Sequence, residues 1–184
     1  LHGVLYTNLT LKAGLYTIPG DLIVAKGVKL TLDPGVQFKF ASSDDMGGGN
    51  NRSKAQLLVY DELVVNGTGA SPVRFYGSST SRGSWYGVMV RGKATAKFLQ
   101  IRHAYHGWTN FGTSLLEDSD ISESSSYNIY QQGGSLTMRR CRSFRASSYG
   151  LYQTSGTLNV SYSQFYRNSS YGIYVYLRSS SSSS

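Results

Sequence analysis

Eight charged residues in one stretch have the types and the spacing to do chemistry. The acids are Glu117, Asp118, Asp120 and Glu123, and the bases are Arg139, Arg140, Arg142 and Arg145. Carboxylates this close together can form a catalytic set or bind calcium through hard oxygen ligands. The dense arginines, in a chain of formal net charge +8, also suggest nucleic-acid binding.

Two polar segments, 41–56 (ASSDDMGGGNNRSKAQ) and 77–84 (GSSTSRGS), hold a second group of candidates. Aromatic rings stack on sugar faces and polar groups bind hydroxyls, which predicts a shallow glycan-binding site here. Its residues are Asp44, Asp45, Asn51, Arg52, Arg82, Trp85 and Tyr86. Calcium bound by Asp44 and Asp45 with Asn50 and Asn51 is an alternative, although the spacing matches no EF-hand. Two surface loops without a ligand are the simplest interpretation.

Three other residues of chemically active types are interpreted as structural. His103 and His106 lack a third metal ligand, so we expect no metal site there. Cys141 is the single cysteine and has no histidine near it in the repeat described below, so we expect a small buried side chain. Apart from the calcium alternative, we expect no cofactor.

The elements that position these residues follow from an internal repeat. The segments 123–130 (ESSSYNIY), 145–152 (RASSYGLY) and 167–174 (RNSSYGIY) are offset by 22 residues each time. The first half has short apolar runs at 22–24, 30–32, 36–40, 57–59, 63–65 and 73–75, separated by turns. This pattern predicts an all-β, single-stranded right-handed parallel β-helix, a solenoid of about seven to eight coils of 20–22 residues with three short strands each.

The repeat also acts as a ruler, because equivalent residues of neighbouring coils lie about 4.8 Å apart. Adding 22 to the number of each acid in the charged stretch gives the number of one of the four arginines. We therefore interpret the stretch as a structural charge ladder, which argues against the catalytic, calcium and nucleic-acid readings. The same ruler predicts two tyrosine ladders, 127–149–171 and 130–152–174. It also places segments 41–56 and 77–84 side by side on one edge.

The segments LIVAKGVKLTLDPGVQFKF, VVNGTGASPVRF and SSYGIYV resemble the right-handed parallel β-helix repeat proteins of the pectate-lyase-like superfamily, closest to its surface or secreted members. The resemblance covers residues 20–178. It implies the fold and leaves the activity open, because this fold carries lyases, hydrolases, epimerases and adhesins. The resemblance does not carry over a catalytic set, since the calcium-binding aspartates and arginine base of pectate lyases cannot be assigned here.

We expect one domain over residues 1–178, with 179–184 as a serine-rich tail or linker. No apolar stretch is long enough to insert into a membrane. Five Asn-x-Ser/Thr sequons exceed the number expected by chance and favour an extracellular or cell-surface glycoprotein. Their asparagines are Asn8, Asn51, Asn66, Asn159 and Asn168.

The preferred functional interpretation is an extracellular or cell-surface β-helix with a structural or adhesive role. No capping helix is visible at either end, so we expect head-to-tail stacking with other copies into filaments. The alternatives are a polysaccharide-active lyase, hydrolase or epimerase, or a glycan-binding module of a larger protein. A non-enzymatic role is favoured because no catalytic set emerges.

Overall fold

Parallel strands stacked in three sheets form the whole fold. The computed structural model describes residues 1–177. Sheet A contains β1 (Gly3–Leu5), β4 (Leu22–Val24), β7 (Gln56–Val59), β10 (Gly87–Val90), β13 (Trp108–Asn110), β16 (Ile129–Gln131), β19 (Leu151–Gln153) and β22 (Ile173–Val175). Sheet B contains β2 (Leu9–Leu11), β5 (Lys29–Leu32), β8 (Glu62–Asn66), β11 (Lys93–Lys97), β14 (Thr113–Glu117), β17 (Ser135–Arg139) and β20 (Thr157–Ser161). Sheet C contains β3 (Gly14–Ile18), β6 (Val36–Phe40), β9 (Val73–Gly77), β12 (Leu99–Arg102), β15 (Asp120–Ser122), β18 (Arg142–Phe144) and β21 (Gln164–Tyr166).

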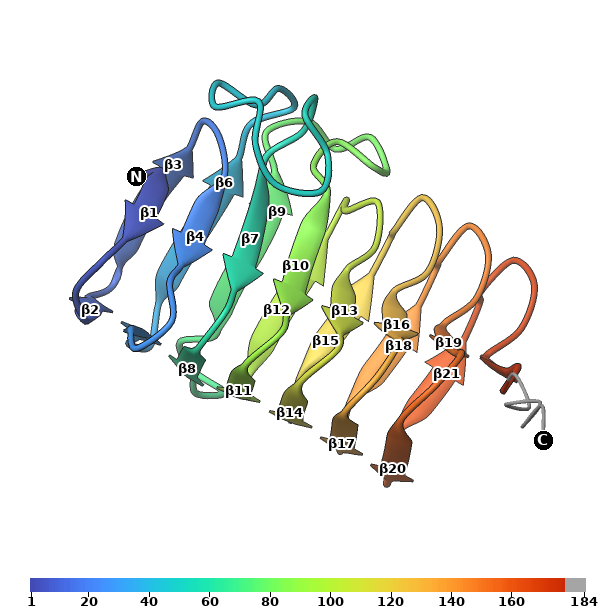
Figure 1. Cartoon of the computed structure of the whole chain (residues 1–184). Coiled ribbons are helices and arrows are strands. Elements are labelled where there is room, and N and C mark those ends of the chain that lie inside the picture. Colours follow the sequence, from blue (N-terminus) through green and yellow to red (C-terminus); the bar gives the residue numbers. More distant parts are fainter. Residues whose placement is uncertain (178–184) are drawn as a thin grey trace, which may run out of the picture.

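The chain visits the three sheets in turn, so each strand pairs with the strand three places later (Figure 1). In the later coils the paired residues are 22 apart, as in Ile129↔Leu151 and Leu151↔Ile173. The expected parallel β-helix, with three strands per coil, is confirmed. The serine-rich segment 179–184 lies outside the described residues.

The bends between sheets use residues in the left-handed backbone conformation. Asp118 (φ 50°) and Arg140 (φ 53°) turn the chain from sheet B to sheet C, and Glu123 (φ 58°) and Arg145 (φ 57°) turn it out of sheet C. Such conformations cost about 1–2 kcal/mol for most residues. The bends therefore place charged side chains at equivalent corners of successive coils.

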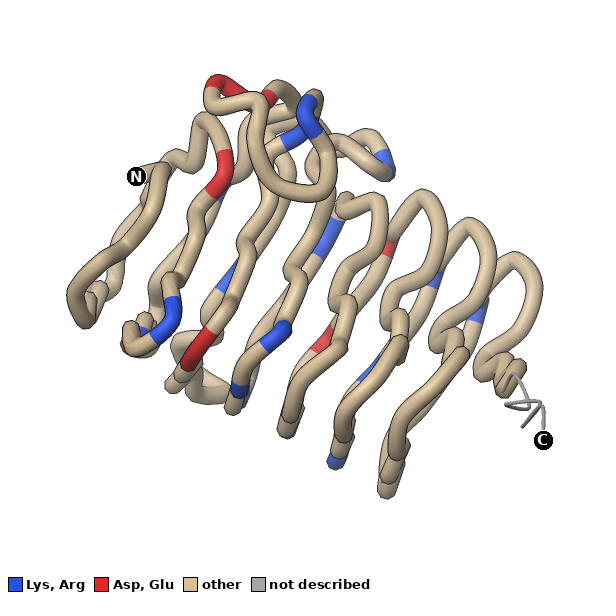
Figure 2. Tube along the Cα trace, viewed as in Figure 1, with Lys and Arg blue, Asp and Glu red and all other residues tan. Residues whose placement is uncertain are grey.

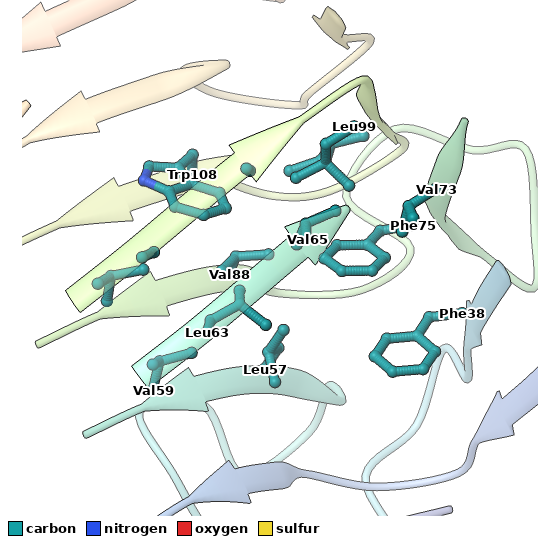
Figure 3. Packing of buried hydrophobic residues seen from close by; sticks show 14 of the residues in the cluster. Phe38, Leu57, Val59, Leu63, Val65, Val73, Phe75, Val88, Leu99 and Trp108 are labelled. Carbon is teal, nitrogen blue, oxygen red and sulfur yellow. The ribbon is translucent and has the colours of Figure 1, made fainter. Parts of the chain in front are cut away.

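The interior is filled by alternate residues of all three sheets. Phe38 and Phe75 stack at 5.1 Å with an interplanar angle of 10°, one coil apart (Figure 3). Trp108 is fully buried and extends the same core toward the later coils. This alternation of inward apolar and outward polar residues is what a half-buried strand requires. The outward positions are therefore free to form sites.

A polar ladder runs inside sheet A in the later coils. Asn110, Gln131 and Gln153 occupy equivalent buried positions. The Asn110 amide donates to Gln131 Oε1 at 2.9 Å, and the Gln131 amide donates to the Gly133 carbonyl at 2.8 Å. Because buried polar groups are costly unless they are hydrogen-bonded, this ladder opposes slippage between coils.

No helix long and apolar enough to cross a membrane occurs among residues 1–177. At the last described coil, Ile173 and Val175 of β22 are 42% and 50% exposed, although their equivalents in earlier coils are buried. Strands β20, β21 and β22 each pair with one neighbour in the described part of the chain.

Candidate functional site

The loops 41–56 and 77–84 lie side by side, as the repeat predicted. The Lys54 ammonium donates to the Gly83 carbonyl, and the hydroxyls of Ser42 and Ser78 are 3.1 Å apart. They enclose a shallow hollow of about 320 Å³, lined by Ser42, Lys54, Ser79, Ser81, Arg82, Gly83 and Ser84. Figure 1 shows loop 41–56 overhanging β7 and β10.

Trp85 does not belong to a surface glycan site, contrary to expectation. Its side chain is fully buried and stacks on Phe40, with ring centroids 4.0 Å apart. Its indole nitrogen donates to the carbonyl of Arg102 at 2.8 Å. A ring with both faces inside the core cannot stack on a sugar, so Trp85 is a core residue.

The remaining residues of the predicted glycan site do not form one cluster. Asp44 points inward and accepts the Met46 N–H at 2.9 Å, and Asn51 accepts the Ser53 N–H at 2.8 Å. Asp45 and Arg52 are exposed. Two further residues contact other coils: Arg82 donates to the Ser147 hydroxyl at 2.9 Å, and Tyr86 stacks on Tyr105 at 5.6 Å.

The charge ladder forms with one change of partner. Two carboxylates, Asp118 and Asp120, each accept two hydrogen bonds from the arginine 22 residues later. Glu123 pairs with Arg145 at 3.6 Å. Glu117 contacts Arg140 at 3.4 Å and Lys97 at 3.8 Å, so the expected Glu117–Arg139 ion pair is wrong. The Arg140 hydrogen bond lowers the pKa of Asp118.

Both tyrosine ladders run along the outside of the later coils. Tyr127 and Tyr149 stack at 5.3 Å, as do Tyr130 and Tyr152. His106 extends the first ladder by stacking on Tyr127 at 4.9 Å, and its burial lowers its pKa to about 4. Within each ladder, a stacked ring therefore covers a face of its neighbour.

A basic groove crosses the outer face of sheet C, where sequence reasoning placed no site. Two cross-strand rows build it: Lys39–Tyr76–Arg102 and Gln37–Arg74–Gln100. One hollow of about 370 Å³ is lined by Arg74, Phe75, Tyr76, Gln100, Arg102 and His103. A second of about 340 Å³ meets it at Gln100 and reaches the charge ladder. We call the first hollow, together with the two cross-strand rows, the sheet C groove.

The cations of the sheet C groove, unlike those of the charge ladder, have no acidic partner. Lys39, Arg74 and Arg102 form no ion pair with any acid among residues 1–177. Arg74 donates only to the neutral Gln100 side chain, at 3.2 Å. Figure 2 shows both charge signs in the earlier coils and only basic positions in the last ones. The groove therefore keeps its guanidinium groups available to an anion.

The alternation along β9 was the signal that could have found this groove. In Val73–Tyr76 the apolar Val73 and Phe75 are buried, so Arg74 and Tyr76 must face out. Comparing these outward positions between neighbouring coils would have shown basic residues that have no acidic residue opposite them.

The remaining residues that the sequence singled out lie among structural contacts rather than in a binding site. Burial raises the pKa of Cys141 to about 11. His103 contacts Glu123 at 3.3 Å rather than a metal ligand set. Among the sequons, Asn8, Asn66 and Asn159 are exposed. Asn168 is less suited to glycosylation, because its amide nitrogen donates to the Ser143 carbonyl at 3.2 Å.

Comparison with known proteins agrees with this architecture. The family model described as "Pectate-lyase like beta helix domain" matches residues 3–173. No curated protein and no solved structure matches the chain. The match covers nearly all described coils, including the sheet C groove and both loops. The chain therefore belongs to the pectate-lyase-like β-helix domain family.

Proposed function

We propose that this protein is an extracellular or cell-surface adhesive β-helix that binds an acidic polysaccharide in the sheet C groove. The observation that carries the proposal is the set of three cations without acidic partners, Lys39, Arg74 and Arg102, on neighbouring strands. Guanidinium groups bind carboxylates in bidentate geometry, whereas lysine supplies a point charge.

The remaining groups of the groove suit a sugar chain. Tyr76 lies in register between Lys39 and Arg102, and its half-exposed ring offers an apolar surface to a pyranose. Gln37 and Gln100 flank Arg74 and can donate to and accept from hydroxyls. The groove follows the solenoid axis, so an extended chain of uronate residues can place successive carboxylates over successive coils.

We propose binding without turnover, because the groove combines cations, amides and one phenol with the His103 imidazole, which Glu123 contacts at 3.3 Å. The carboxylates nearest to it, Asp118 and Asp120, are held by Arg140 and Arg142. Members of this fold class carry many unrelated activities, so the family supports a polysaccharide partner only by analogy.

Affinity electrophoresis in gels containing polygalacturonate or a neutral glucan tests this proposal. We expect retardation only in the acidic gel, weakening with added salt. Arg74→Gln and Arg102→Gln should each reduce affinity about tenfold, since a hydrogen bond to a charged group contributes about 1.5–3 kcal/mol. Arg167→Gln, an exposed arginine at a distant corner, is the matched control. Equal retardation of all variants would overturn the assignment, and release of new reducing ends would replace binding by catalysis.

A second proposal, head-to-tail stacking into filaments, has a separate observation in its favour. The last described coil exposes Ile173 and Val175 beside the half-buried Leu158, Val160 and Phe165. Another coil laid on this surface would bury these side chains and pair three strands at once. Electron microscopy over a concentration series should reveal fibres that Val175→Lys abolishes. Single particles at every concentration would exclude stacking.

A further inference from the structure

Two buried polar side chains beneath loop 41–56 have no hydrogen-bond partner of normal geometry. Asp21, just before β4, and Gln56, at the start of β7, are both fully buried. Neither carboxylate oxygen of Asp21 and neither amide atom of Gln56 has a partner of normal hydrogen-bond geometry. Unsatisfied buried groups of this kind are costly, and an unpaired buried carboxylate is the most costly.

A second carboxylate lies beside them. Asp44 Oδ1 accepts the Asp21 N–H at 3.3 Å, and Asp44 Oδ2 accepts the Gly48 N–H at 3.1 Å. Burial first and the Asp44 charge second raise the pKa of Asp21 to about 6, and weaker hydrogen-bonding interactions with the side chain and the backbone of Gln56 oppose this rise. Neither aspartate forms an ion pair with a lysine, arginine or histidine in residues 1–177.

The glycine run of the loop closes tightly over this cluster. At Gly49 (φ 59°) a Cβ would lie 2.5 Å from Asp21 Oδ2 and would also collide with the Gln56 amide. At Gly48 a Cβ would lie 3.2 Å from the same oxygen. Only glycine lets the Asp21 carboxylate and the Gln56 amide approach the loop backbone this closely, and no lysine, arginine or histidine among residues 1–177 pairs with the cluster. A compensating charge there must be a compact ion rather than a side chain.

We propose that Asp21, Asp44 and Gln56 form a calcium-binding site that closes loop 41–56 over sheet A. Two carboxylates and an amide oxygen are hard donors, and calcium accepts irregular sets of such oxygens, completed by backbone carbonyls or water. Magnesium demands a stricter octahedral geometry and gives up its water reluctantly. The site differs from the calcium alternative raised by the sequence, since Asp21 and Gln56 replace Asp45 and the two loop asparagines.

The site has a structural consequence for sheet A. Leu58 and Met89 face outward from β7 and β10 yet are only 2% and 8% exposed. Loop 41–56 supplies the cover, and the Asn50 amide contacts the Met89 sulfur at 2.8 Å. A bound ion that ties Asp44 to Asp21 holds the loop in this position.

Thermal unfolding of the full chain in chelator and in millimolar calcium chloride tests the inference. Because an ion that binds only the folded state stabilises it, we expect calcium to raise the midpoint by at least about 4 °C. Asp21→Asn should lose this shift while unfolding at the same or a higher temperature in chelator, since it removes a buried charge. Asp61→Asn, the same change at an acid of the turn before β8, should keep the shift.

Two further measurements make the test independent of the variant's folding. Calorimetric titration of the unaltered protein should detect one calcium per chain, and magnesium at equal concentration should give no comparable heat. Limited proteolysis should cleave within 41–56 faster in chelator than in calcium. No midpoint shift in the unaltered protein, or a full shift retained by both Asp21→Asn and Asp44→Asn, would overturn the site. Neither result bears on binding in the sheet C groove.

Discussion

Replacing Trp85 by alanine should unfold the protein more readily rather than remove a ligand contact. The side chain is fully buried, lies parallel to Phe40 at a centroid distance of 4.0 Å, and donates to the Arg102 carbonyl at 2.8 Å. Truncating a buried tryptophan costs about 3–5 kcal/mol through lost burial and the cavity left behind. For a chain of this length the midpoint should fall by roughly 6–20 °C.

Equilibrium urea unfolding followed by far-ultraviolet circular dichroism measures this loss. Trp85→Phe keeps a ring against Phe40 but leaves the Arg102 carbonyl without its donor, so it should lose about 1–3 kcal/mol. Tyr162→Ala removes a side chain that is 89% exposed and should change stability by less than about 0.5 kcal/mol. A Trp85→Ala protein as stable as the Tyr162→Ala control would refute the buried placement. It would restore Trp85 as a surface residue.

Three further changes report on the coils. Asn128→Ala should cost about 2–3 kcal/mol in urea unfolding, because the buried side-chain oxygen accepts the Ser124 N–H at 3.2 Å and that N–H would be left without an acceptor. A neutral substitution would contradict the buried network. Asp118 has a folded pKa lowered by Arg140, so its contribution is present above the unfolded pKa and is lost as pH falls through the folded pKa. Asp118→Asn should therefore reduce the loss of stability in acid, and an unchanged pH profile would speak against the ion pair. Cys141, whose pKa burial raises to about 11, should resist a thiol reagent at pH 8 until urea unfolds the chain; fast labelling of the folded protein would show that it is exposed.

The coil architecture could be predicted from the sequence because the repeat determines which residues of neighbouring coils lie opposite each other. The 22-residue offset places Asp120 opposite Arg142 and Tyr130 opposite Tyr152, and these pairs form. Glu117 departs from the ruler because Arg140 stands at a left-handed corner, from which its guanidinium reaches two acids. Backbone register predicts which residues face each other, but not the direction of a long side chain at a bend.

The site was less predictable, for two physical reasons. Trp85 follows loop 77–84, whose length interrupts the regular period, so the direction of its ring could not be deduced from neighbouring coils. Asp21 is a lone acid before an apolar strand, and only the folded loop brings Asp44 and Gln56 to it. The sheet C groove was accessible to pattern reasoning, since Arg74 occupies an outward position between buried Val73 and Phe75.

The two ligand proposals occupy different parts of the solenoid. The sheet C groove uses Lys39, Arg74 and Arg102 on outward strand positions, whereas the calcium site lies beneath loop 41–56 at Asp21. Trp85 connects core and groove, because its indole binds the backbone of Arg102. Stability variants should therefore be compared with binding variants before any loss of affinity is assigned to direct contact.

Backbone amide chemical-shift mapping with a short oligogalacturonate tests the central claim most directly. The account predicts shifts concentrated on β6, β9 and β12 around Arg74, Tyr76 and Arg102, saturating with ligand and suppressed by salt. Amides of the tyrosine ladders and of β20 should stay unchanged. Shifts centred on the tyrosine ladders, or none at any ligand concentration, would contradict binding in the sheet C groove.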